Sequence, residues 1–227
     1  MKIKNNVLAE SFIGKLFFRF YKNRKFTASD DYWEERYSKG KNSGAGSYNE
    51  LARFKAEVLN GFVQKQNIRS VIEFGCGDGN QLQLANYPKY IGLDVSKTTI
   101  QNCIGRFAGD PTKSFFLYNS HSFADKHQVF RAELALSLDV IYHLIEDWVF
   151  EAYMSHLFGA AEKYVIIYSS NSDSQQLFHV KQRKFTNWID SNCPNWEFVE
   201  IIKNKYPYNP KDPSNTSFAD FYVYRKI

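Results

Sequence analysis

The stretch "VIEFGCGDGNQ", from Val71 to Gln81, passes from an apolar run through one acid into three alternating glycines. An apolar run that ends in glycines is typical of a buried strand followed by a sharp turn. Gly75 permits the turn, Gly77 leaves room for a ligand against the backbone, and Gly79 lets the next segment start close to the strand. The stretch therefore predicts a ligand site beyond the carboxyl end of a strand.

The rest of the chain alternates between strand-like and helix-like patterns. Strands are expected at 70–75, 89–96, 114–120, 132–144, 164–171, 196–206 and 217–226, the fourth running into a loop or helix. Helices are expected from a capping box at Ser47 and Glu50 to about Asn67, from about Asn80, at 98–107 and at 149–164. Repeated β-α units imply an α/β fold: a doubly wound, mostly parallel seven-stranded sheet with an antiparallel C-terminal strand pair and an N-terminal helical leader.

Length and composition favour one sizeable domain with a substantial core. The chain has 227 residues, of which 44% are apolar. Within that domain we expect residues 1–67 to form the leader and a lid, and residues 68–227 to form the core with its C-terminal β-hairpin. The formal net charge of +5 weakly favours anionic surroundings, without choosing among a membrane face, a phosphorylated substrate and nucleic acid.

The three cysteines are scattered and form no C-x-x-C pair. Neither a disulfide framework nor a metal site is therefore expected, and a reducing compartment is the natural reading. Glu10 and Lys15 interrupt any apolar signal-peptide core, and no apolar run approaches the length of a bilayer span. We expect a cytoplasmic protein.

Residues 9–25 have the pattern of an amphipathic helix, with aromatic and aliphatic side chains on one face and basic ones on another. Such a helix either packs on its own domain or docks on a partner protein or on the inner face of the membrane as a peripheral contact.

The glycine spacing discriminates among nucleotide-like ligands. A dinucleotide site needs its third glycine where this chain has Asn80, which disfavours an NAD-dependent dehydrogenase, and the Gly-Lys-Ser/Thr of a P-loop is absent. The observed acid-x-G-x-G-x-G pattern resembles the first motif of the class I S-adenosylmethionine-dependent methyltransferases, and the resemblance extends over about residues 70–170. It implies a Rossmann-like methyltransferase fold and S-adenosyl-L-methionine as the cofactor, with S-adenosyl-L-homocysteine as the product.

The resemblance assigns roles to two acids. It implies that Glu73 orients the amino-acid end of the cofactor, and that Asp94, at the end of the second strand, accepts hydrogen bonds from the ribose hydroxyls. A helix N-cap or a solvated turn is the alternative for Asp94. The other implied cofactor contacts are Gly75, Cys76, Gly77, Gly79 and Val95, then Asn119, Ser120 and His121 near the adenine, and Ser137 and Leu138 near the methionine part. For Asn119 to His121, an ordinary polar turn is the alternative.

The leader adds a weaker resemblance. The stretch 32–60 is similar to leaders of bacterial methyltransferases, some of them associated with surface-polysaccharide or other glycan pathways. In such enzymes the leader closes over the cofactor, which implies pocket roles for Trp33, Tyr37, Ser43 and Gly44. A surface helix with a flexible turn is the alternative.

His143 is the first candidate for a general base, because it follows the fourth strand and histidine titrates near neutrality. A structural histidine bonded to a loop carbonyl is the alternative. Asp139 is the second candidate base, with a cofactor-orienting role as its alternative. Tyr142 is expected to contact the substrate.

The segment 171–189 follows the fifth strand and brings basic side chains to the substrate side. His179, Arg183 and Lys184 are the candidates there for gripping a phosphate or a carboxylate-bearing sugar. A solvated helix face is the alternative.

Several acceptor classes are disfavoured. The segment "LDVIYH" at 138–143 lacks the Asn/Asp-Pro-Pro-aromatic motif of amino-methylating nucleic-acid enzymes, and no paired-glutamate loop of arginine methyltransferases is found. We expect O-methylation of a sugar or glycan, with or without a phosphate, and no nucleic-acid partner. The alternatives are another small metabolite, a protein side chain, or a module that binds the cofactor without turnover.

Overall fold

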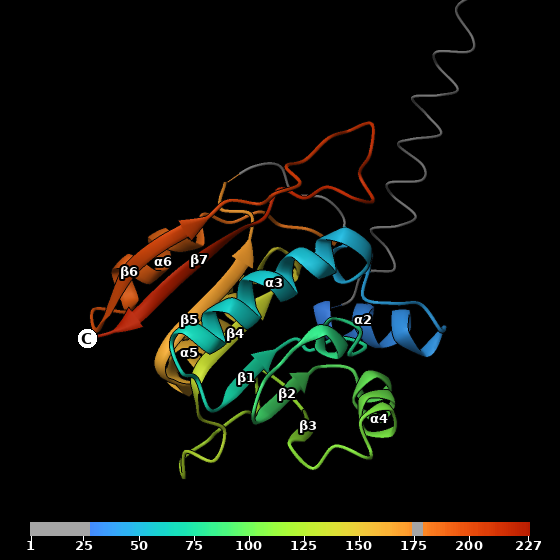
Figure 1. Cartoon of the computed structure of the whole chain (residues 1–227), viewed down its shortest axis with the longest axis horizontal. Coiled ribbons are helices and arrows are strands. Elements are labelled where there is room, and N and C mark those ends of the chain that lie inside the picture. The colour runs from blue at the N-terminus through green and yellow to red at the C-terminus, as the bar shows by residue number, and fades with distance from the viewer. Residues whose placement is uncertain (1–27, 174–178) are drawn as a thin grey trace, which may run out of the picture.

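The computed structural model describes residues 28–173 and 179–227. Its centre is one seven-stranded sheet with the order β3-β2-β1-β4-β5-β7-β6 (Figure 1). The strands are β1 (Val71–Phe74), β2 (Tyr90–Asp94), β3 (Lys113–Leu117), β4 (Ala132–Leu138), β5 (Ala161–Ser169), β6 (Trp196–Ile202) and β7 (Asp220–Lys226). The amphipathic segment expected at 9–25 lies outside the described residues.

The pairing confirms the expected doubly wound sheet. Strands β1 to β5 pair in parallel, whereas β7 runs antiparallel to both β5 and β6. The chain order reverses between β3 and β4, which sit on opposite sides of the β2-β1 pair. In a sheet of this kind the carboxyl ends of the strands at the reversal point are where a ligand binds.

Helices cover both faces of the sheet (Figure 1). They are α2 (Ser29–Ser38), α3 (Asn49–Lys65), α4 (Lys97–Arg106), α5 (Asp147–Ala160) and α6 (Phe185–Asn192), with 3₁₀ helices η1 (Ala45–Ser47), η2 (Gln81–Leu84) and η3 (Ile141–His143). Among the described residues, no helix is long and apolar enough to cross a bilayer.

The core has two layers because strand side chains alternate between the two faces of the sheet. In β1, Ile72 and Phe74 pack with the α5 and α6 layer, whereas Val71 packs with the α3 layer. All three side chains are fully buried. The run "VIEF" is thus the buried strand that the sequence predicts, and the glycine turn leaves from its carboxyl end.

The prediction of a helix from about Asn80 is wrong. Only the single 3₁₀ turn η2 forms there, and the chain is extended from Ala85 onward. Pro88 disfavours helix in the residues just before it. The side-chain amide of Asn60 on α3 donates to the Leu84 carbonyl (2.9 Å) and accepts from the Asn86 N–H (2.8 Å), so a tertiary contact satisfies the short turn.

The expected capping box is also wrong. Helix α3 begins at Asn49, and its N-cap, Tyr48, makes no side-chain capping bond within the described residues. Glu50 instead pairs with Arg53 one turn further along the helix. Asn49 has φ 51°, so the chain enters the helix through a left-handed residue, which asparagine tolerates.

Candidate active site

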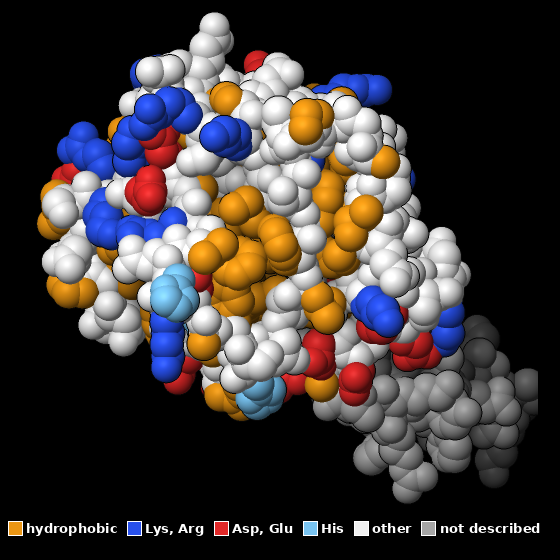
Figure 2. All heavy atoms as spheres, turned by 90° about the horizontal axis from the view of Figure 1, so that it is seen from below, with side chains coloured by type: hydrophobic (Ala, Val, Ile, Leu, Met, Phe, Trp, Pro, Cys, Tyr) orange, Lys and Arg blue, Asp and Glu red, His pale blue; other side chains and the backbone are white. Residues whose placement is uncertain are grey.

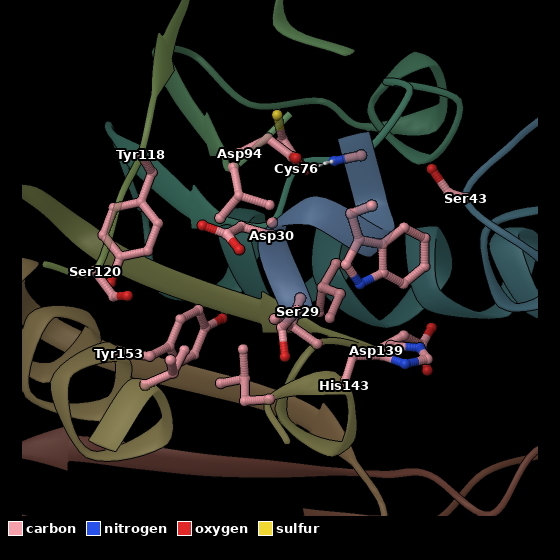
Figure 3. A pocket seen from close by; sticks show the side chains of 18 of the residues that line it. Ser29, Asp30, Ser43, Cys76, Asp94, Tyr118, Ser120, Asp139, His143 and Tyr153 are labelled. Carbon is pink, nitrogen blue, oxygen red and sulfur yellow. Dashed lines mark hydrogen bonds between the residues drawn. The ribbon is translucent and has the colours of Figure 1, made fainter. Parts of the chain in front are cut away.

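A cavity lies beyond the carboxyl ends of β1, β2, β3 and β4, and side chains of α2 also line it. Figure 3 shows its labelled side chains spread from Tyr118 and Ser120 at one end to Asp139 and His143 at the other, with Asp30 and Asp94 between them. The residues that line it include Gly75, Cys76 and Gly77 after β1, Asp94 and Val95 at β2, Asn119, Ser120 and His121 after β3, Leu138 at β4, and Trp33, Tyr37 and Ser43 of the leader.

The glycine turn is bare because other parts of the protein approach it closely. Gly75 has φ 85°, and a Cβ there would lie 2.4 Å from a Val140 methyl group. A Cβ on Gly77, at φ 57°, would lie 2.4 Å from the Ser43 hydroxyl oxygen. The leader therefore occupies the space that the Gly77 side chain leaves, and the missing Cβ serves the lid as well as a ligand.

Asp94 is held by the turn that precedes it. Its side chain is buried, and its two carboxylate oxygens accept hydrogen bonds from the backbone N–H groups of Gly77 and Ser96, both at 2.9 Å. Burial raises the pKa of Asp94 to about 6, although the backbone donors oppose this shift. Ser96 caps α4 by accepting from the Thr99 N–H, so Asp94 is not the helix N-cap. Each carboxylate oxygen keeps a lone pair for another donor.

Glu73 and Gln81 present acceptor atoms at the same end of the cavity. The Tyr90 hydroxyl donates to Glu73 at 2.6 Å, and burial raises the pKa of the Glu73 carboxyl to about 7. The side-chain amide of Gln81 donates to the Ala52 carbonyl at 3.0 Å, but its Oε1 has no hydrogen-bond partner among the described residues. A buried acceptor without a donor is costly, so this end of the cavity suits a ligand that carries a cationic N–H group.

Asp139 is bound on both carboxylate oxygens. Oδ2 lies 2.7 Å from Nζ of Lys55, and Oδ1 accepts from the Tyr142 hydroxyl at 2.9 Å. Lys55 is only 1% exposed, and Asp139 has φ 60°, so a fully buried ammonium holds a left-handed residue at the end of β4. This geometry favours the orienting role for Asp139 over the role of free base.

His143 is bonded to a loop carbonyl, the structural alternative that the sequence left open. Its Nδ1 lies 3.0 Å from the His179 carbonyl oxygen, and because a carbonyl only accepts, Nδ1 carries the proton and Nε2 the lone pair. The ring packs edge-on against Trp33 and beside Tyr142, with centroid distances of 4.9 and 4.5 Å. Burial lowers the pKa of His143 to about 4, so the ring is neutral at neutral pH.

The leader is attached over the glycine turn. The Ser43 N–H donates to Asp78 Oδ2, and the Asp78 N–H donates to the Ser43 hydroxyl, both at 2.9 Å. The Tyr48 hydroxyl adds a bond of 2.8 Å to the same carboxylate oxygen. For the turn at Ser43 the sequence leaves two alternatives open, a flexible surface turn and a part of the pocket. In the structure these hydrogen bonds attach the turn to the site.

Helix α2 is attached at two further points. The Glu34 carboxylate accepts from the hydroxyls of Ser96 and Thr98, each at 2.6 Å, at the N-terminus of α4. The Ser29 hydroxyl donates to Glu146 at 2.6 Å, just before α5. Both contacts place polar atoms at helix N-termini, where backbone N–H groups favour negative charge.

The structure does not bring every predicted site residue into the cavity lining. Those left out are Gly44, Gly79, Ser137, Tyr142, His179, Arg183 and Lys184. Ser137 is buried, and its hydroxyl oxygen accepts a hydrogen bond from the Tyr153 hydroxyl at 2.7 Å. The guanidinium of Arg183 donates to the Leu144 and Ile145 carbonyls at 3.0 and 3.1 Å, so it supports the loop after β4 and does not face a ligand.

Sequence reasoning missed several lining residues, which include Lys55, Gln81, Tyr118, Trp148 and Tyr153. A signal for Lys55 was present: it lies four residues from both Leu51 and Leu59, on the apolar face of α3. A lysine in the middle of an apolar stripe points to a buried partner.

No family model and no curated protein matches the chain, so the comparisons rest on solved structures. The N-methyltransferase NodS from Bradyrhizobium japonicum WM9, in complex with S-adenosylhomocysteine, is similar with a TM-score of 0.66 at 12% identity, over 88% of this chain and 99% of that one. Magnesium protoporphyrin IX methyltransferase from Synechocystis PCC 6803, with the same ligand bound, has a TM-score of 0.59 at 14% identity, over 94% and 100%. The methyltransferase domain of a bacterial Hen1 has a TM-score of 0.58 at 20% identity, over 78% and 99%. At these identities the likeness shows the Rossmann-like methyltransferase fold.

Proposed function

We propose that the protein binds S-adenosyl-L-methionine and transfers its methyl group to a small acceptor. The observation that carries the proposal is Asp94, a buried carboxylate held by the N–H of Gly77 and facing a cavity at the reversal point of a methyltransferase-type sheet. An acid in this position accepts the two hydroxyls of a ribose.

The remaining lining residues fit the other parts of the cofactor. The unpartnered Gln81 Oε1 and the Glu73 carboxyl suit the ammonium group, and Lys55 suits the carboxylate of the amino-acid end. Asn119 and Ser120 line the end expected for the adenine. When bound, the cofactor supplies a methyl group that its sulfonium has already activated. The protein then has to hold the acceptor in line with the carbon–sulfur bond and keep water out of the cavity. Keeping water out is the role we propose for the attached leader.

A dinucleotide is the rival ligand for a fold of this kind. The glycine spacing disfavours it, because the third glycine of a dinucleotide site falls at Asn80 in this chain. Calorimetry with S-adenosylhomocysteine and with NAD tests the choice. We expect a measurable heat only for S-adenosylhomocysteine, and tight NAD binding would overturn the proposal.

The Asp94→Asn variant tests the ribose contact. Asparagine keeps the shape but loses the charge that strengthens two hydrogen bonds, so the affinity for S-adenosylhomocysteine should fall roughly 10- to 100-fold. In the wild-type protein the affinity should also fall below pH 6, where Asp94 takes up a proton. Asp190→Asn on the exposed side of α6 is the matched control, and equal affinities in the two variants would count against the assignment.

For the acceptor, the sequence favours a sugar or glycan hydroxyl, and its support is the leader resemblance alone. A phosphorylated sugar has less support, because the basic side chain predicted to hold it, Arg183, is bound to the loop after β4. A tritiated-methyl assay separates a methyltransferase from a module that binds the cofactor without turnover. The cytoplasmic location, and a membrane or partner contact through residues 9–25, stay predictions.

Nucleic acid is not proposed as a partner. Figure 2 shows one face of the molecule with hydrophobic side chains gathered at its centre, and with Lys and Arg toward its margins among Asp and Glu. That face offers no continuous basic surface to a phosphate backbone.

A further inference from the structure

The described lining of the cavity is rich in carboxylates. It contains Asp30, Glu73, Asp94, Asp139 and Glu146 against one lysine, Lys55, whose ammonium is 2.7 Å from Asp139. Because the proposed cofactor carries two positive charges and one negative charge, its binding leaves an excess of negative charge on this wall. The wall therefore opposes a phosphate or carboxylate on the acceptor and attracts a cation.

Basic side chains beside the cavity do not offset the negative charge of its wall. Lys181 Nζ and an Arg183 nitrogen both lie against one oxygen of Asp147, at 2.6 and 2.5 Å. In the part of the chain that the structure describes, these cations of the segment after β5 are thus already paired at the start of α5. An anionic acceptor would have to break those pairs to be held there.

Three of the groups that could remove a proton from a hydroxyl, Asp139, Glu146 and His143, are occupied or weak. Both oxygens of Asp139 are bound by Lys55 and Tyr142, and the two oxygens of Glu146 accept from the N–H and the hydroxyl of Ser29 at 3.1 and 2.6 Å. Nε2 of His143 has a lone pair, but the pKa of about 4 makes it a poor base for an alcohol. Amines and carboxylates attack without such a base, and the charge of the wall disfavours carboxylates.

We propose that the acceptor is an amine, so that the protein is an N-methyltransferase of a neutral or cationic small molecule. This rests on the proposed function and replaces the hydroxyl as the attacking group. The amine enters uncharged at nitrogen, having left its proton in solvent. Its nitrogen forms the bond to the methyl carbon as the carbon–sulfur bond breaks, and the electron pair of that bond stays on sulfur. The methylated ammonium then releases a proton to solvent.

His143 acts in this scheme as a positioning residue. Its Nδ1–H is fixed on the His179 carbonyl, which leaves Nε2 as an acceptor on the cavity side. An acceptor nitrogen of this kind takes the N–H of the amine and directs the amine lone pair, without having to hold a proton. The low basicity of the ring is then an advantage, because the ring stays unprotonated and Nε2 keeps the lone pair that accepts the N–H of the amine.

Bisubstrate analogues test the proposal without knowledge of the natural acceptor. In these compounds a nitrogen replaces the sulfur of the cofactor and carries a 2-aminoethyl, a 2-hydroxyethyl or a carboxymethyl arm, which reaches from the methyl position into the acceptor site. Calorimetry on the full chain should give an affinity for the aminoethyl compound about tenfold higher than for the hydroxyethyl compound, with the carboxymethyl compound weaker still. Equal affinities, or a preference for either of the other arms, would overturn the proposal.

The Glu146→Gln variant tests the electrostatic basis. Glutamine still accepts from the Ser29 N–H but removes one negative charge, so the preference for the aminoethyl arm should shrink by about threefold. Glu151→Gln, on the exposed side of the adjoining helix α5, is the matched control and should not change it. Asp30→Asn repeats the test from the leader side if Glu146→Gln does not fold. If the wild-type protein does not bind S-adenosylhomocysteine at all, the proposed function itself is wrong, so the two failures are distinguishable.

Discussion

At the scale of single residues, the site depends on polar atoms whose partners are fixed. The proton on His143 Nδ1 is assigned by a carbonyl acceptor, and the ring is neutral because burial lowers its pKa. Asp94 shows the opposite case, in which burial raises a carboxyl pKa toward neutrality. In both residues the cost of burying a charge sets the protonation state.

The tautomer and the pKa of His143 can be measured by ¹⁵N NMR of the imidazole. At pH 7 we expect the neutral ring with its proton on Nδ1, and protonation only near pH 4. The unfolded chain, in which histidine has a pKa of about 6.5, takes up the proton first as the pH falls. The free energy of unfolding should therefore decrease between about pH 6.5 and pH 4, and the His143→Asn variant should lack this contribution. A titration of His143 near pH 6.5 would contradict the assignment.

At the scale of elements, the leader is held to the core by contacts at the glycine turn and at two helix N-termini. Ser43 and Asp78 exchange backbone and side-chain hydrogen bonds, and Glu34 and Ser29 fix the two sides of α2. These contacts are polar and part-buried, and their residues lie outside the two apolar core layers, so they can open without disturbing the core. A ligand can reach the cavity while these contacts are open.

The Asp78→Ala variant tests this attachment. It removes the carboxylate that accepts from the Ser43 N–H, the Tyr48 hydroxyl and the Asn80 N–H. Hydrogen exchange in residues 41–47 should therefore accelerate by at least about tenfold, the effect expected for loss of the Ser43 bond to a charged group alone. Dissociation of S-adenosylhomocysteine should accelerate as well. Asp190→Ala on α6 should change neither rate. Unaltered exchange in residues 41–47 of Asp78→Ala would show that the segment is held by other contacts.

At the scale of the whole molecule, α3 is joined to the sheet by apolar packing and by one buried ion pair. Leu59 and Phe62 belong to the core layer on the α3 side, and Lys55 reaches from the same helix to Asp139 at the end of β4. The ammonium also lies 5.3 Å from the centre of the Tyr168 ring on β5. One side chain thus links the leader to β5 and to the residue that follows β4 at the site.

Loss of Lys55 should destabilise the protein more than loss of the whole pair. Lys55→Met leaves the Asp139 charge without its partner, which should lower the free energy of unfolding by about 3–5 kcal/mol in urea titrations. The double variant Lys55→Met/Asp139→Asn removes both charges and should recover most of that loss. Equal destabilisation in the single and double variants would mean that Lys55 acts through packing alone.

The sequence by itself determined the buried strand β1, the glycine turn, the order of the strands along the chain, and the acid at the end of β2. These follow from local rules: apolar runs of strand length, glycines where the chain turns, and alternating periodicities. It did not determine where the helix after the glycine turn stops, because that depends on Asn60 of another helix. The predicted capping box at Ser47 is wrong for a related reason. The leader on either side of Ser47 is held by hydrogen bonds from Ser43 and Tyr48 to Asp78 of the glycine turn.

Only the tertiary structure decided which charges at the site are free to act. Arg183 and Lys184 resembled a basic grip in the sequence, but the folded chain binds Arg183 to carbonyls and leaves Lys184 on the surface. Lys55, which is distant in sequence, lies beside Asp139 and makes it part of a buried pair. Local patterns fix where a side chain stands along its own element, whereas the partner that neutralises a buried charge comes from elsewhere in the chain and is known only once the elements have packed.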